Sequence, residues 1–118
     1  MTDEELLEVI QEAEESKATE LYLSKKELTA LPPELFLLTD LTTLDLSYNR
    51  LTFLPAEIKY LTNLFELDLS GNELTTLPPE LGQLTNLLWL GLDGNRLISL
   101  SPEICQLNNL NWLNLSGN

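Results

Sequence analysis

A repeat of 23 residues is the feature that most restricts how this chain can fold. Asparagine recurs at this interval at Asn49, Asn72, Asn95 and Asn118, and glutamate recurs at Glu34, Glu57, Glu80 and Glu103. From residue 18 the chain divides into units at 18–40, 41–63, 64–86, 87–109 and 110–118, of which the fifth is unfinished. A fixed period of this length is typical of solenoids, in which each unit buries its apolar residues only against its neighbours.

Each unit contains two parts with different apolar periodicity. In the first part, such as LTTLDLSYN in the second unit, Leu44 and Leu46 alternate with Asp45 and Ser47, which indicates a strand with one apolar and one polar face. The second part, such as LPAEIKYL, is long enough for only about two turns of 3₁₀- or α-helix. We therefore expect an α/β fold with parallel strands near residues 20–24, 43–47, 66–70, 89–93 and 112–116.

The segment before the repeats predicts an amphipathic helix over residues 2–15. Thr2 and Glu5 have the spacing of a capping box, in which each side chain bonds to the backbone N–H of the other residue. An apolar stripe at helical spacing is formed by Leu6, Leu7, Ile10 and Ala13. We expect residues 1–17 to be an N-terminal capping helix, with Leu6, Leu7 and Ile10 facing the first unit, and residues 18–118 to be the repeats. A docking helix for a partner is the alternative.

The units resemble the leucine-rich repeat family, whose pattern LxxLxLxxNxLxxLPxEIxxLxx they follow over about 100 of the 118 residues. The resemblance implies a curved solenoid with a concave parallel sheet and short helical turns on the convex side. It also implies a non-enzymatic module that binds a protein or peptide on the concave face. Asn49, Asn72 and Asn95 would be structural, with buried amides bonded to the backbone of adjoining units, because an unpaired buried amide costs about 1–3 kcal/mol.

Two finer resemblances concern the parent protein. The LPxEI form of the repeat is similar to the repeats of Ras-group intracellular proteins. The opening LLEVIQEAEESKATELYLSKKELTALPPEL resembles the start of bacterial Roco proteins, in which a GTPase domain follows the repeats. The chain itself has no GxxxxGK[ST] phosphate-binding loop. The alternatives to a binding module are therefore a regulatory repeat fragment of a Roco-like GTPase, and a truncated or engineered repeat fragment with no ligand.

Composition argues against several functions. The 19 acidic and 6 basic residues give a net charge of −13, which would repel nucleic acid and anionic membranes. The chain has no histidine for a nucleophile–base pair and no Cys/His cluster for zinc, so we expect no enzyme, no metal and no cofactor. The lone Cys105 excludes an internal disulfide and is expected to be a partly buried, inert thiol. The opening residues lack a secretory-signal pattern, so we expect a cytoplasmic protein.

Two carboxylates, Asp45 and Asp68, fall side by side on the expected concave face. They could share a proton, or hold a calcium ion together with Ser47 and Ser70, which we place on the same outward face. Two carboxylates without a pocket are poor ligands. We therefore expect both to be solvated on an open face.

Two tryptophans, Trp89 and Trp112, occupy equivalent outward positions in adjacent strands. Exposed aromatic side chains are common anchors of protein interfaces. We expect a gap beside them at Gly91, and the candidate partner-binding residues are Trp89, Trp112, Gly91, Asp93, Asp68, Asn114, Phe65 and Leu88. Such a shallow receptor would fit an apolar side chain flanked by a basic one. The alternative is an aromatic pair that only stabilises two strands, by about 0.2–1 kcal/mol.

The fifth unit has its strand but not its helical turn. Apolar side chains of units four and five are therefore expected to be exposed at this end, with candidates at Leu97, Leu100, Ile104, Leu107, Leu110, Leu113 and Leu115. The last strand would also leave one edge unpaired. We expect either a homodimer that sets strands 112–116 of two chains side by side and antiparallel, or a frayed end from about residue 110.

Overall fold

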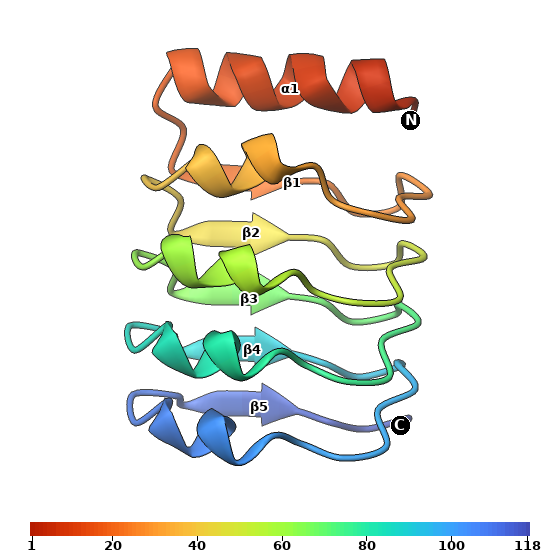
Figure 1. The fold of residues 1–118 in the computed structure, drawn as a ribbon, viewed down its shortest axis with the longest axis vertical. Coiled ribbons are helices and arrows are strands. Elements are labelled where there is room, and N and C mark those ends of the chain that lie inside the picture. The colour runs from red at the N-terminus through yellow and green to blue at the C-terminus, as the bar shows by residue number, and fades with distance from the viewer.

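The computed structural model describes all 118 residues as one continuous stack of a helix and five repeats (Figure 1). Helix α1 (Asp3–Glu15) covers the N-terminal end. The strands are β1 (Glu20–Tyr22), β2 (Thr43–Asp45), β3 (Glu66–Asp68), β4 (Trp89–Gly91) and β5 (Trp112–Asn114). The 3₁₀ turns are η1 (Pro33–Leu37), η2 (Ala56–Tyr60), η3 (Pro79–Gln83) and η4 (Pro102–Gln106). No helix is both long and apolar enough to cross a membrane.

The five strands form one parallel sheet in chain order, as the period predicts. The register pairs equivalent residues of successive units, so that Leu44, Leu67 and Leu90 form one inward row. The 3₁₀ turns lie on the other side of the stack (Figure 1). The predicted leucine-rich solenoid with a concave parallel sheet is therefore confirmed. The strands span three residues rather than five, because the chain turns away after the third residue, where the Ser47 N–H bonds back to the side chain of Asp45.

Helix α1 begins with the predicted capping box. The Thr2 N–H donates to Glu5 Oε1 at 3.0 Å, and the Glu5 N–H donates to Thr2 Oγ1 at 3.1 Å. The hydrogen bond from the Thr2 backbone N–H, and after it one from the Thr2 side chain, hold the pKa of the Glu5 carboxyl below its ordinary value. The helix buries Leu6, Ile10 and Ala13. Leu7 also points toward unit one, beside Leu31 and Pro32, but it is 41% exposed, because it lies about 100° around the helix from Leu6, at the edge of the contact.

One hydrophobic cluster of 28 buried residues runs through the stack. Buried asparagines accompany it. The Asn72 side chain accepts from the Leu51 N–H at 3.0 Å and donates to the Leu46 and Leu69 carbonyls at 3.0 and 3.1 Å. Asn49 and Asn95 make the equivalent bonds in their own units. Each amide thus joins the backbones of two successive units where no sheet hydrogen bond is available.

Burial decreases at the C-terminal end of the stack. Leu113 is 39% exposed, although Leu67 and Leu90 in the same row are 0% exposed. Leu100 and Leu115 are each 37% exposed. The expectation that Leu107 is exposed is wrong, because it belongs to the continuous core, against which Leu97, Ile104 and Leu110 pack half-buried.

Cys105 is exposed, so the expectation of a partly buried thiol is wrong. The exposure is explained by comparison with Gly82, which occupies the equivalent position in the preceding unit. A Cβ at Gly82 would approach the Glu103 carbonyl oxygen to 2.3 Å, which shows how tightly η4 covers that position. No further turn covers Cys105.

Candidate protein-binding face

The concave face is formed by the first and third residues of each strand. In chain order these residues are Glu20, Tyr22, Thr43, Asp45, Glu66, Asp68, Trp89, Gly91, Trp112 and Asn114. The parallel register places equivalent members side by side, so that Asp45 lies next to Asp68 and Trp89 next to Trp112. None of the ten is basic. The face is therefore acidic over β1–β3 and aromatic over β4 and β5.

The two tryptophan rings stack face to face. Their centroids are 4.4 Å apart and their planes differ by 3°. Trp89 is half-buried, and Trp112 is 42% exposed. The separation is close to the spacing of about 4.8 Å between neighbouring strands, so the sheet itself sets this stacking distance. The pair presents a broad, rigid apolar area to solvent.

The expected gap at Gly91 is wrong. Gly91 is buried, and a Cβ built there would lie 2.9 Å from Cη2 of Trp89 and 2.8 Å from Oδ1 of Asp68. The Trp89 ring folds over the glycine and fills the space that a side chain would otherwise take. Gly91 thus allows the indole to lie flat, and the surface is a platform rather than a pit.

A hydrogen-bonded turn fixes each of the two central carboxylates. Oδ1 of Asp68 accepts from the Ser70 N–H at 3.0 Å and from its hydroxyl at 2.6 Å. Oδ1 of Asp45 accepts from Ser47 in the same way, at 2.9 and 2.6 Å. The expectation that these serines point outward is wrong. Ser47 is 4% exposed and Ser70 is 6% exposed, because each hydroxyl turns back to the carboxylate two residues earlier.

This arrangement decides what the carboxylates can do. The serine hydroxyls direct their protons at the aspartates, so the calcium arrangement considered from the sequence does not form. No group of three or more His, Cys, Asp or Glu side chains that could hold a metal ion is present. Each aspartate has one oxygen held in the turn, which fixes the orientation of the other oxygen.

Tyr22 and Glu20 are functional-face residues that the sequence analysis did not single out. The Tyr22 hydroxyl donates to Glu20 Oε2 at 2.6 Å. This bond, then partial burial, then the negative charges of Glu20, Glu66 and Asp45 raise the pKa of Tyr22 above its ordinary value. The outward alternation in the first unit was the available signal. These three acidic residues, Glu20, Asp45 and Glu66, lie on β1, β2 and β3.

The remaining predicted residues lie around this area. Phe65 is 48% exposed and Leu88 is 41% exposed, and both immediately precede their strands. Phe65 also borders an open groove of about 500 Å³ at the start of the strands, lined otherwise by polar and charged residues: Lys17, Thr19, Asp40, Thr42, Asn63 and Asn86. Asp93 is half-buried, and its carbonyl accepts from the Gly71 N–H at 2.8 Å. The predicted partner-binding residues thus lie partly at the tryptophan platform and partly at the N-terminal ends of the strands.

Comparison with known proteins identifies the repeats. A family model described as leucine rich repeat matches residues 16–74 and 66–118. No curated protein matches the chain. A leucine-rich repeat protein of Leptospira interrogans is 39% identical, with a TM-score of 0.74, over 90% of this chain and 33% of that one.

Two plant structures from Arabidopsis thaliana are also similar. The complex of BIR3 and SERK2 contains a chain that is 34% identical, with a TM-score of 0.71, over 83% of this chain and 55% of that one. The ectodomain of the membrane receptor kinase GASSHO1/SCHENGEN3, in complex with Casparian strip integrity factor 2, is 42% identical, with a TM-score of 0.71, over 81% of this chain and 12% of that one. The chain thus spans a third, about half and an eighth of these three proteins. On these matches and on its own architecture, the chain belongs to the leucine-rich repeat family.

Proposed function

We propose that the chain is a non-enzymatic binding module that recognises a partner protein or peptide with its concave face. The observation that carries this proposal is the stacked, half-exposed pair of Trp89 and Trp112 on a rigid sheet. Large aromatic side chains held in place lose little entropy on binding and often dominate interface energies. Two of the similar structures are complexes with another protein or a factor, which supports the same use of the fold.

The charge of the face indicates the chemistry of the partner. Glu20, Asp45, Glu66 and Asp68 lie on β1–β3, on one side of the tryptophans, and no basic residue lies among the outward strand positions. The matching partner carries an apolar or aromatic side chain for the platform, with lysine or arginine beside it. Electrostatic complementarity of this kind accelerates encounter and selects against acidic partners.

Selection from a random peptide display library tests the proposal. Trp89 and Trp112 are the only tryptophans, so their fluorescence reports directly on binding at the platform. We expect selected peptides to combine apolar and basic residues, to change this fluorescence, and to bind the Trp89→Ala/Trp112→Ala variant at least about tenfold more weakly. The control is Tyr60→Ala, which removes a 54% exposed aromatic residue from a convex turn. Peptides that bind wild type and double variant equally would place the site elsewhere.

A second candidate is a regulatory repeat segment that serves a larger protein, for which the opening sequence suggests a Roco-like GTPase. The observation that favours it is the partial coverage of the similar proteins, which is as low as 12% for the plant receptor kinase. A coding sequence that continues after residue 118 into further repeats and a phosphate-binding loop would support this candidate. A fragment with no ligand remains the third alternative, and a library that yields no binder at the platform would favour it.

The exposed end of the stack suggests a self-association surface for the 118-residue chain. Leu100, Leu113 and Leu115 are each more than a third exposed there. Strand β5 also has a free edge. Directly after β4, the Leu92 and Gly94 N–H groups donate to the carbonyls of Asn114, in β5, and of Ser116, two residues beyond it. The equivalent N–H groups of the fifth unit have no strand beyond them. A second copy related by a two-fold axis would pair with this edge and cover both leucine faces. In a longer chain, a further unit would cover the same face.

A further inference from the structure

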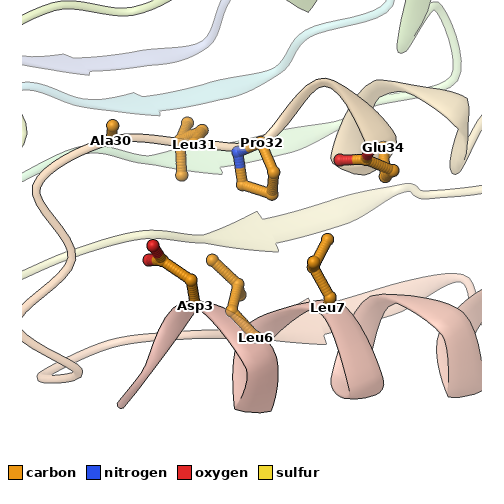
Figure 2. A pocket seen from close by; sticks show the side chains of 7 residues that line it. All are labelled: Asp3, Leu6, Leu7, Ala30, Leu31, Pro32 and Glu34. Carbon is orange, nitrogen blue, oxygen red and sulfur yellow. The ribbon is translucent and has the colours of Figure 1, made fainter.

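A slot separates helix α1 from the segment of unit one that leads into η1. Its volume is about 290 Å³, and it is lined by Asp3, Leu6, Leu7, Ala30, Leu31, Pro32 and Glu34. Figure 2 shows Leu6 and Leu7 rising from the helix toward Leu31 and Pro32 on the opposite side. Leu6 and Leu31 are 3% and 9% exposed and form the floor, while Leu7 is 41% exposed and forms one wall.

One small residue, Ala30, lies at the edge of the slot. Unit two carries Phe53 at the position of Ala30, and units three and four carry Thr76 and Ser99 there. Each later unit also stacks against another repeat turn, whereas unit one stacks against the round surface of a helix. The combination of Ala30 and α1 therefore occurs only at this end of the stack.

The two carboxylates of the slot have no cationic partner. The chain has two ion pairs, Arg50–Glu27 and Arg96–Glu73, and neither involves Asp3 or Glu34. The Met1 amine is the positive group nearest to Asp3 in the sequence, and it donates to the Lys26 carbonyl at 3.3 Å. The slot thus combines an apolar floor with two carboxylates that are free to accept hydrogen bonds from a cation.

We infer that this slot is a second docking site, which takes an aliphatic side chain adjacent to an arginine on a partner protein. The aliphatic side chain covers Leu6, Leu7 and Leu31. The guanidinium meets the carboxylate at one end of the slot, Asp3 or Glu34, which lie at opposite ends in Figure 2. Ligand pockets usually exceed about 300 Å³, so a slot of this volume fits one or two side chains rather than a larger small molecule. Its span along the helix, from Asp3 to Leu7, is about 6 Å, which matches a single extended side chain. The site is independent of the tryptophan platform.

The inference is tested by nuclear magnetic resonance with acetyl-leucyl-arginine amide as the probe. We expect saturable shifts of the backbone amide signals of residues 3–7 and 30–34, because the probe supplies both required groups. The matched probe replaces arginine with citrulline, which keeps the shape and removes the charge. We expect the citrulline probe to bind several-fold more weakly. Equal binding of the two probes, or no shifts in these two segments at tens of millimolar probe, would overturn the inference.

Variants of the slot test separately how its charges and its shape contribute to binding of the probe. Whichever of Asp3→Asn and Glu34→Gln removes the contacted carboxylate should weaken binding of the arginine probe by about 1.5- to 5-fold, as expected for an exposed charge pair. The control is Glu57→Gln with Glu80→Gln, which changes the equivalent glutamates of units that do not contact α1.

Ala30→Phe installs the residue that unit two tolerates at this position, and it should weaken binding by crowding the edge of the slot. Binding must also persist in Trp89→Ala/Trp112→Ala, which separates this site from the concave face. Undiminished binding in Ala30→Phe, or equal losses in the control pair and in the slot variants, would refute the assignment.

Discussion

The hydroxyl of Ser70 donates a 2.6 Å hydrogen bond to Oδ1 of Asp68, two residues earlier in the chain. The same turn occurs in the fifth unit with an amide as the acceptor, where the Ser116 N–H and hydroxyl donate to Oδ1 of Asn114 at 3.0 and 2.8 Å. An amide oxygen therefore supports this turn as a carboxylate does. The negative charge of the concave face is a separate property that can be removed without loss of the turn.

We predict that Asp45→Asn/Asp68→Asn leaves the free energy of unfolding nearly unchanged but weakens peptides that carry lysine or arginine. The expected loss is about two- to tenfold at low salt, because exposed charge pairs contribute about 0.2–1 kcal/mol each and are screened by ions. Fluorescence titration at two salt concentrations measures it. Glu57→Gln/Glu80→Gln, with the same change in charge on the convex side, is the control and should have little effect. Equal losses in both double variants would show that only net charge matters.

We predict that Asn72→Ala lowers the free energy of unfolding by about 2–4 kcal/mol. It leaves the buried Leu51 N–H without a hydrogen-bond partner, and it removes one of the two side-chain amides that donate to each of the Leu46 and Leu69 carbonyls. Asn63→Ala makes the same change at an exposed position, where the side chain donates only to the Thr39 carbonyl, and it should cost less than about 1 kcal/mol. Urea denaturation of both variants measures the difference. Equal costs would mean that burial of the amide is unimportant.

We predict that Gly71→Ala destabilises the fold more than Gly94→Ala, although both residues have a positive φ, of 67° and 66°. Each change should cost about 1–2 kcal/mol for the left-handed backbone. At Gly71, the new Cβ would also lie 2.4 Å from Cδ1 of Tyr48, whereas the nearest atoms to a Cβ at Gly94 are 3.5 Å away. Tyr48→Gly should remove the difference between the two alanine variants, as measured by urea denaturation. A difference that persists would point to a cause other than the Tyr48 ring.

We predict that Tyr22 ionises at a higher pH than an unperturbed tyrosine side chain. Its pKa is raised by the hydrogen bond to Glu20, by partial burial and by the negative charges of the concave face. A raised pKa means that the stabilisation by neutral Tyr22 is fully present below its ordinary pKa of about 10, and is lost as the pH rises through the folded value. Ultraviolet titration at the phenolate band measures the ionisation. Glu20→Gln should lower the pKa of Tyr22 toward its ordinary value, and a titration unchanged by this variant would contradict the assigned cause.

The repeat period was sufficient to predict the architecture. Leucines that return at one interval in every unit, such as Leu44, Leu67 and Leu90, have to share one row, because the parallel register joins equivalent positions. The capping box of Thr2 and Glu5 was equally readable, since it depends only on local spacing. Features that follow from period and local geometry could therefore be predicted without coordinates.

Details of the candidate site depended on side-chain directions that periodicity does not contain. Ser70 was placed outward by strand alternation, but the turn after the third strand residue ends that alternation. The space beside Gly91 was expected to be open, but which way the Trp89 indole folds is decided by its rotamer and by its stacking on Trp112. Cys105 is exposed because no further helical turn packs against its unit, and the residues of the unit itself do not indicate this.

Our last prediction is that the 118-residue chain associates as a two-fold dimer at tens of micromolar. Burying several leucines that are more than a third exposed contributes on the order of 1 kcal/mol for each, and pairing two β5 edges adds backbone hydrogen bonds. Light scattering should give the mass of two chains. Leu113→Lys/Leu115→Lys should give the mass of one, as should a chain extended by a complete polar capping unit. Ile98→Thr is the control: it removes an 86% exposed apolar residue and installs the residue of Thr75, which occupies the same exposed position one unit earlier, so it should leave the dimer intact. A monomeric wild-type chain, or a dimer that survives the capping unit, would refute the end-face pairing.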